Sequence, residues 1–225
     1  MKNRKKVYVG LSADILHEGH INILKIANSY GDVTVGLLTD EAIASYKNIP
    51  YLDFKRRKII LQNIKFVKKV IPQETLDYVK NLNIIKPDYV VHGDDWKDNR
   101  LQAHIRNEVM EALESYGGEL IEVPYTEGVS KNSLENDYHL NRASTDLRRG
   151  MLRRLINSKP VVRVMEAHSP ISALIAEKSH FEIEAQVRFF DAFWSSSLTD
   201  STEMGKPDIE ALDISERLSN INNIF

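Results

Sequence analysis

The sequence contains no cysteine among its 225 residues, which excludes disulfides, thiolate nucleophiles and cysteine-ligated metal sites. It also has little excess charge, with a formal net charge of −2 at pH 7, so it has no broad electrostatic footprint for nucleic acid. No apolar run reaches the length of a membrane span, and the basic start is not followed by the apolar region of a secretory signal. These absences predict a soluble cytoplasmic protein with neither nucleic acid nor a membrane as partner.

The sequence does have ample material for a buried core, because 42% of its residues are hydrophobic and its length suits one or two domains. Apolar runs alternate with segments of helical periodicity over the first 135 residues. We expect strands at 7–11, 32–38, 67–71, 88–92 and 119–123, and helices at 21–30, 41–47, 54–64, 74–83 and 101–116. This alternation predicts an α/β fold, a doubly wound parallel sheet with helices on both faces.

The turn between the first strand and the first helix carries the clearest chemical signal. Such a turn directs backbone N–H groups and the positive end of a helix dipole toward a bound anion. His17 and His20 lie three residues apart at the start of the helix, so they share one face and can converge on the same phosphoryl oxygens. Gly19 has no Cβ and leaves room for a close ligand. The turn therefore predicts a phosphate site.

Two other interpretations of the histidine pair are open on the residues alone. One is a zinc site, although the metalloprotease pattern places its histidines at i and i+4, whereas His17 and His20 are at i and i+3. The other is a pair of surface histidines without a role.

The turn resembles the HxGH signature of the nucleotidylyltransferases, in particular the cytidylyltransferases that make CDP-alcohols. In that family both imidazoles stabilise the charge that builds on the α-phosphate of CTP while pyrophosphate leaves. Further marks of the family follow in order along residues 5–133. The resemblance implies these catalytic residues: His17, His20, Lys47, Arg57 and Ser130. It implies these nucleotide-binding residues: Asp14, Gly19, Asp94, Trp96, Thr126 and Gly128.

Each of these later residues also has a purely structural interpretation. Lys47 and Arg57 are alternatively solvated surface charges, Asp94 a turn residue, Trp96 a packing residue and Ser130 a helix cap. The chain also departs from the family pattern. Leu11-Ser12-Ala13 replaces Gly-Thr-Phe before Asp14, Tyr125 replaces an arginine, and Lys131 and Asn132 replace threonines. These departures leave the acceptor open.

A divalent ion is expected with the nucleotide. A triphosphate brings about four negative charges into one crevice, and Mg²⁺ prefers phosphate and carboxylate oxygens. We expect Mg²⁺ to bridge the phosphates of CTP and the carboxylate of Asp14. No general base is required, because the attacking phosphate or phosphonate oxygen of the acceptor is already ionised.

The sequence changes character after a polar linker at 134–146. Residues 147–225 resemble the opening of phosphoenolpyruvate mutase, the (β/α) barrel enzyme that forms the carbon–phosphorus bond of phosphonopyruvate. That resemblance places Trp194, Ser196 and Leu198 at the border of the substrate and Asp208 on the gating loop at the phosphoryl group. The predicted architecture is thus a Rossmann-like nucleotidylyltransferase domain followed by an incomplete (β/α) barrel segment, a truncated or split version of a fused enzyme.

Together the two resemblances imply transfer of CMP from CTP to a phosphonate, such as 2-aminoethylphosphonate, or to a phosphate monoester. They also imply a homodimer, since HxGH enzymes are often dimers, and a separate mutase domain as a partner. Two alternatives are a non-catalytic nucleotide-binding or assembly module, and the isomerase activity that the second segment would suggest.

We predict that the 225-residue chain has no mutase activity. A (β/α)₈ barrel needs roughly 250 residues, whereas 147–225 can supply about two β/α units, and the mutase family's Asp-x-Asp-Thr-Gly magnesium-binding stretch does not occur in the sequence. Phosphorus NMR of the purified chain with phosphoenolpyruvate checks this, with a full-length mutase as positive control. Formation of phosphonopyruvate would contradict it.

Overall fold

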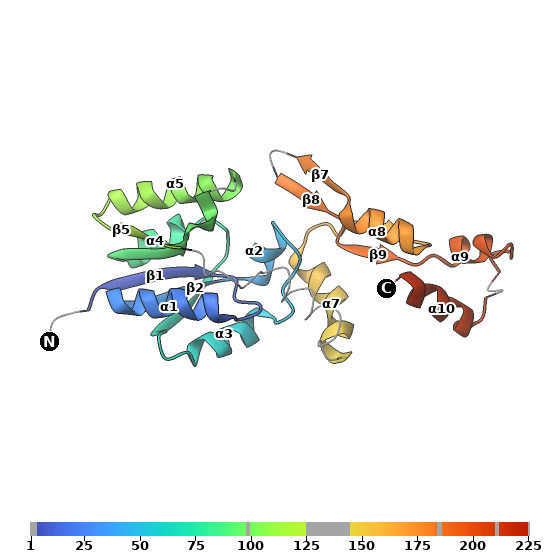
Figure 1. Cartoon of the computed structure of the whole chain (residues 1–225), viewed down its shortest axis with the longest axis horizontal. Helices are drawn as coiled ribbons and strands as arrows, with labels where there is room; N and C mark the ends of the chain where they lie inside the picture. The colour runs from blue at the N-terminus through green and yellow to red at the C-terminus, as the bar shows by residue number, and fades with distance from the viewer. Residues whose placement is uncertain (1–3, 98–99, 125–144, 184–185, 210–211, 225) are drawn as a thin grey trace. The chain divides into compact units, whose positions relative to one another are not determined.

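A computed structural model describes residues 4–97, 100–124, 145–183, 186–209 and 212–224 of the chain (Figure 1). The chain divides into two compact units, Met1–Ser158 and Lys159–Phe225. The division falls after Ser158, whereas the sequence analysis starts the second segment at 147. Helix α7 (Thr145–Ser158), which crosses the predicted boundary at 147, belongs to the first unit.

The first unit is built on a five-stranded parallel sheet with the strand order β3-β2-β1-β4-β5. Its strands are β1 (Lys6–Leu11), β2 (Asp32–Leu38), β3 (Lys69–Gln73), β4 (Tyr89–Gly93) and β5 (Glu119–Val123). Its other helices are α1 (Glu18–Tyr30), α2 (Asp40–Ala44), α3 (Phe54–Gln62), α4 (Val79–Ile85) and α5 (Arg100–Glu114), with a 3₁₀-helix, η1, at Asp94–Lys97. The predicted α/β fold is confirmed.

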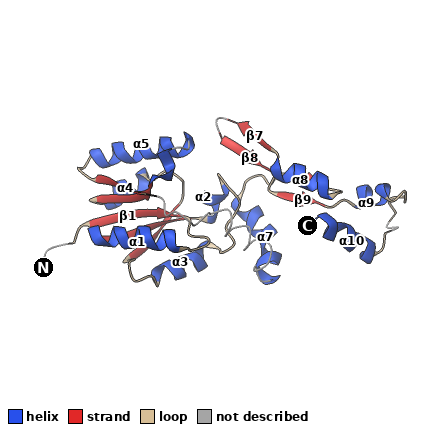
Figure 2. Ribbon diagram, in the orientation of Figure 1, coloured by secondary structure: helices blue, strands red, loops and turns tan. Residues whose placement is uncertain are grey.

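Helices cover both faces of this sheet (Figure 2). One core joins inward residues of the strands to Leu24 of α1 and Leu61 of α3. A second core joins Tyr8 of β1 to Leu82 of α4 and Leu113 of α5. The two cores lie on opposite faces, because successive side chains of a strand such as β1 point to opposite sides of a sheet. Strands buried on both faces explain the nearly continuous apolar runs in the sequence.

The strand order reverses at β1, which places the ligand crevice of such a sheet at the carboxyl ends of β1 and β4. β1 is paired with β2 from Lys6 to Leu11. With β4 it is paired only at Val7 and Tyr8, near its start. The two strands therefore separate toward their carboxyl ends, and the turns that follow them border the same opening.

The middle of the sheet is tied together by a close backbone approach at Gly36 of β2. A Cβ at this position would lie 1.7 Å from the hydroxyl oxygen of Tyr8 and 2.7 Å from Oε1 of Gln73. Those two atoms are hydrogen-bonded, since the Tyr8 hydroxyl donates to Gln73 Oε1 at 2.7 Å. Burial raises the pKa of Tyr8, which keeps its hydroxyl protonated as a donor. Only glycine fits here without displacing this bond.

The second unit contains a parallel pair, β6 (Val164–Glu166) with β9 (Ala192–Trp194), and an antiparallel hairpin, β7 (His180–Ile183) with β8 (Gln186–Phe189). Its helices are α8 (Pro170–Lys178), α9 (Ser197–Glu203) and α10 (Ile214–Ile224). The order β6-α8 followed by β9-α9 gives two β/α repeats with the hairpin between them. The described residues of this unit form no closed barrel.

None of the helices in the described ranges combines the length and the apolar character that crossing a membrane requires.

We expect Gly36→Ala to destabilise the first unit by about 2 kcal/mol, since overpacking a well-packed core typically costs 1–3 kcal/mol. The added methyl group must displace the Tyr8 hydroxyl from Gln73. Urea unfolding followed by circular dichroism measures the change. Gly150→Ala is the matched control, because a Cβ on that α7 residue meets no atom within 4 Å. Equal stability of both variants would contradict the packing argument.

Candidate functional site

The two histidines of the β1–α1 turn form the N-terminal cap of α1. His17 is the N-cap residue, and its Nδ1 accepts a hydrogen bond from the backbone N–H of Gly19 at 3.1 Å. The Nδ1 of His20 accepts in return from the backbone N–H of His17 at 3.4 Å. This reciprocal pattern is a capping box, made here by two imidazoles in place of the usual hydroxyl and carboxylate. The motif therefore sets where the helix begins.

The same bonds bring the two rings together. The ring centroids of His17 and His20 are 4.0 Å apart with an interplanar angle of 50°, and both residues are half-buried. Because each Nδ1 accepts a hydrogen bond, a neutral ring carries its proton on Nε2. The pair thus supplies two N–H donors at the positive end of a helix dipole. Their convergence on a phosphoryl group stays a prediction.

Within the described part of the chain, no three His, Asp or Glu side chains gather as a metal centre would require. The zinc interpretation of the histidine pair therefore gains no support from the geometry.

The turn before His17 contains a residue with a positive φ, and its Asp14 contacts a neighbouring loop. Ala13 has a φ of +50°, the left-handed region that residues other than glycine seldom adopt. The carboxylate of Asp14 accepts backbone hydrogen bonds from Tyr51 at 2.9 Å and from Leu52 at 3.1 Å. Asp14 thus ties the turn to the segment at 48–53, named here the clamp loop. Its predicted metal contact stays a prediction.

Arg57, which the resemblance implies is a catalytic residue, has a fully buried side chain and is not a solvated surface charge. Its guanidinium donates to Leu52 O at 3.0 Å, to Ser12 O at 2.5 Å and to Asp40 Oδ1 at 2.7 Å. Every guanidinium nitrogen is therefore bonded to the protein itself. Arg57 therefore holds the clamp loop and the residue after β1 in position, and its predicted catalytic role stays a prediction.

Lys47 follows α2 and is half-buried. Its ammonium lies 5.6 Å from the centroid of the Tyr46 ring, and its backbone N–H donates to Ile43 O at 3.0 Å. It immediately precedes the clamp loop in the sequence. Its predicted catalytic role stays a prediction.

The turn after β4 carries a packed aromatic cluster. Trp96 is 2% exposed, it stacks on His92 with ring centroids 3.8 Å apart, and its Nε1 donates to Glu122 at 2.9 Å. This burial favours the packing interpretation of Trp96 over a direct nucleotide contact. Asp94 is half-buried at the start of η1, beside the crevice. His92, near the end of β4, packs against this indole and is not among the residues that the sequence singles out.

The remaining predicted residues fall in two groups. Thr126, Gly128 and Ser130 lie outside the described residues, as do Tyr125, Lys131 and Asn132. The mutase-like residues lie in the second unit: Trp194 at the end of β9 is 62% exposed, Leu198 is exposed, Ser196 is the N-cap of α9, and Asp208 is exposed. No barrel encloses them within the described residues.

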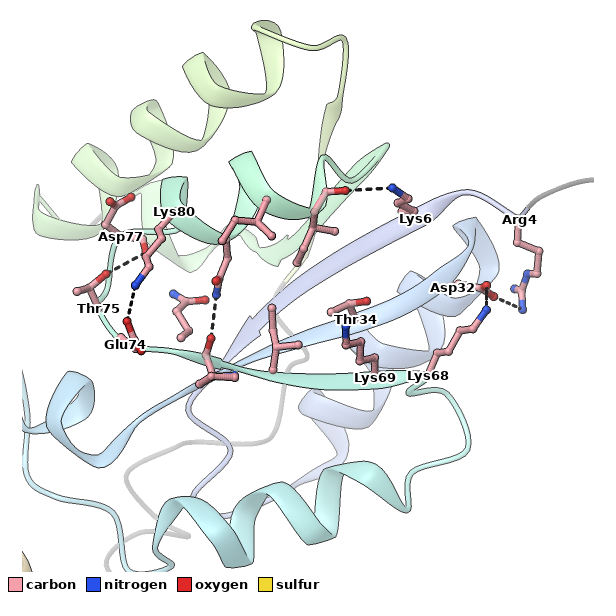
Figure 3. A pocket seen from close by; sticks show the side chains of 16 residues that line it. Arg4, Lys6, Asp32, Thr34, Lys68, Lys69, Glu74, Thr75, Asp77 and Lys80 are labelled. Carbon is pink, nitrogen blue, oxygen red and sulfur yellow. Dashed lines mark hydrogen bonds and ion pairs between the residues drawn. The ribbon is translucent and has the colours of Figure 1, made fainter.

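A separate cavity of about 760 Å³ lies against β3 and α4 (Figure 3). Charged side chains around it are paired with one another, as Lys80 is with Glu74 at 2.5 Å and Lys68 is with Asp32. None of the predicted site residues lines it, so this cavity is distinct from the crevice at β1 and β4.

Two known protein families match successive parts of the chain. Residues 8–150 match the family described as cytidylyltransferase-like, and residues 152–225 match phosphoenolpyruvate phosphomutase. The glycerol-3-phosphate cytidylyltransferase of Bacillus spizizenii is 31% identical over 135 residues, 59% of this chain and 96% of that protein. The enzyme of the same name from Staphylococcus aureus is 35% identical, over 41% of this chain and 72% of its own. The ethanolamine-phosphate cytidylyltransferase of Arabidopsis thaliana is 34% identical, over 42% of this chain and 24% of its own.

We expect Arg57→Met to destabilise the first unit by about 2 kcal/mol or more, because each buried acceptor that loses its hydrogen-bond donor costs about 1–3 kcal/mol, although Asp40 keeps its bond to Arg154. Asp40 and the carbonyls of Ser12 and Leu52 would each lose a donor. Urea unfolding measures the loss. Arg56→Met is the matched control, since the Arg56 side chain is 55% exposed and should change stability by about 0.5 kcal/mol or less. A fully stable Arg57→Met variant would refute the positioning role.

Proposed function

Because this chain belongs to the cytidylyltransferase-like family, we propose that it transfers CMP from CTP to a phosphonate or phosphate monoester and releases pyrophosphate. The observation that supports this most is the histidine pair, two adjacent imidazole rings that cap the helix at the carboxyl edge of β1. This is the edge at which a doubly wound sheet binds its ligands.

In the proposed reaction an anionic oxygen of the acceptor attacks the α-phosphorus of CTP. A new P–O bond forms, the bond from the α-phosphorus to the β-phosphate oxygen breaks, and pyrophosphate leaves with that electron pair. Negative charge builds on the α-phosphoryl oxygens in the transition state. His17 and His20 donate to those oxygens through Nε2, and the N–H groups of the first turn of α1 add to the stabilisation.

We propose that Mg²⁺ enters as part of the substrate, bound to CTP. Mg²⁺ commonly combines one or two carboxylates with substrate phosphates and waters. The site fits this mode, because Asp14 offers one carboxylate, which also accepts two backbone hydrogen bonds, whereas the described residues supply no cluster of carboxylates for an all-protein site. Magnesium would neutralise phosphate charge, while the protein orients the nucleotide.

The acceptor we propose is a phosphonate, with 2-aminoethylphosphonate as the first candidate. Its support is the match of residues 152–225 to phosphoenolpyruvate phosphomutase in the same chain. A chain that joins both families resembles those of phosphonate biosynthesis. Glycerol 3-phosphate and phosphoethanolamine are the competing acceptors, since two of the relatives are named for these compounds.

We expect CTP-dependent release of pyrophosphate with one member of a panel of phosphonates and phosphate monoesters. A coupled pyrophosphate assay gives the rate, and mass spectrometry identifies the CMP adduct. ATP, GTP and UTP serve as competing nucleotides. No turnover with any acceptor, together with CTP binding by calorimetry, would contradict the proposal and favour a non-catalytic nucleotide-binding module.

The same assay separates catalysis from folding at the histidine pair. His17→Asn keeps an N-cap acceptor, since asparagine caps helices well, but it removes the ring. We expect His17→Asn and His20→Ala each to lower kcat on the order of a hundredfold, with a smaller loss of CTP affinity. His104→Ala is the control, because that α5 residue is 72% exposed. Equal losses of rate and affinity would contradict a role in the transition state.

A further inference from the structure

Helix α7 contributes an arginine that bonds to the clamp loop and to Asp40. Arg154 donates from Nη1 to the carbonyl oxygen of Tyr51 at 2.7 Å and from Nη2 to Asp40 Oδ2 at 2.9 Å. Its side chain is 19% exposed, and that of Asp40 is 14% exposed. The bonds join residues 103 and 114 positions apart in the sequence. A long-range contact of this kind fixes α7 against the clamp loop.

The clamp loop is held from three directions by charged side chains. Asp14 accepts from the N–H groups of Tyr51 and Leu52. Arg57 donates to the carbonyl of Leu52, and Arg154 donates to the carbonyl of Tyr51. Asp14 belongs to the turn that carries the histidine pair, so the loop and the turn are parts of one network.

Asp40 connects the two arginines. One of its carboxylate oxygens accepts from Arg57 at 2.7 Å, and the other accepts from Arg154 at 2.9 Å. Bonds between a guanidinium and a carboxylate are charge-assisted and fix geometry more strictly than neutral hydrogen bonds. Because Arg57 keeps its own bonds to Asp40, Leu52 and Ser12, loss of Arg154 alone releases one side of the loop and leaves the rest of the network in place.

We propose that Arg154 is a positioning residue of the transferase site, which acts by fixing the clamp loop and with it Lys47. The proposal rests on the proposed function. It also assigns a role in nucleotidyl transfer to a residue beyond the cytidylyltransferase-like match, which ends at 150, and within the phosphomutase match, which begins at 152. The physical transferase unit extends through α7.

The first test measures the loop itself and does not depend on turnover. In Arg154→Met, amide hydrogen exchange at Tyr51 and Leu52, followed by NMR on the full chain, should accelerate on the order of tenfold. Arg153→Met is the matched control, because Arg153 is its exposed neighbour on α7 and should leave exchange unchanged. Leu113→Ala, in the core on α5, controls for a general loss of stability. Arg154→Lys should recover part of the protection.

The second test asks whether the loop acts on the reaction through Lys47. Arg154→Met should lower kcat on the order of tenfold or more, as small misplacements of positioning groups do, with a smaller change in KM for CTP. Lys47→Met should lower kcat at least as much. If Arg154 acts through Lys47, the double variant should be no slower than Lys47→Met alone, since coupled residues are not additive.

The outcomes separate this proposal from the proposed function. Unchanged exchange at Tyr51 and Leu52 in Arg154→Met overturns the proposal whatever the activity. Faster exchange with unchanged kcat and KM shows that Arg154 fixes the loop without affecting catalysis, and it overturns the proposal. Additive losses in the double variant overturn the route through Lys47. If exchange is faster in Arg154→Met but the wild-type chain turns over no acceptor, Arg154 does fix the clamp loop and the proposed function is wrong.

Discussion

The hydrogen bonds that cap α1 are the interaction on which the rest of the site depends. Two histidine rings close the first turn of the helix through Nδ1. The capping pattern needs acceptors three residues apart, and so it forces the rings side by side. It also fixes the tautomer, because a ring that accepts at Nδ1 carries its proton on Nε2. Folding and the proposed chemistry thus use the same two rings, and under that proposal the helix cap preorganises the two donors before a ligand arrives.

Four charged side chains form a second network of hydrogen bonds in the first unit. Asp14, Arg57, Asp40 and Arg154 are directed at one another and at backbone atoms of the clamp loop and the β1 turn. Buried ion pairs seldom add much stability, because desolvation offsets their attraction. What they do add here is fixed geometry, since each bond has one direction and one partner. The clamp loop has no regular secondary structure, so these side-chain bonds fix it in the way that backbone ladders fix the strands of the sheet.

How far the sequence predicts this structure depends on the range of the interactions involved. The strands and the turn with His17 and His20 follow from local periodicity and from their order along the chain. Helix α4 begins at Val79 and not at 74, because the Asp77 carboxylate accepts from the backbone N–H of Val79 and holds the preceding segment as a turn. The roles of Arg57 and Trp96 depended on which way a side chain points, and that is decided by Asp40 and Glu122 elsewhere in the chain. Arg154 has no local signal at all.

The boundary between the two family matches differs from the boundary between the two folded units. A family model ends where residues stop resembling those of relatives, at 150 here. A folded unit ends where buried contacts stop, and the bonds of Arg154 to Asp40 and Tyr51 carry the first unit through Ser158. Helix α7 spans the end of the first match and the start of the second, and Arg154, which bonds to the first unit, lies beyond the first match. Such a helix can become part of a site whose chemistry was set by the earlier domain alone.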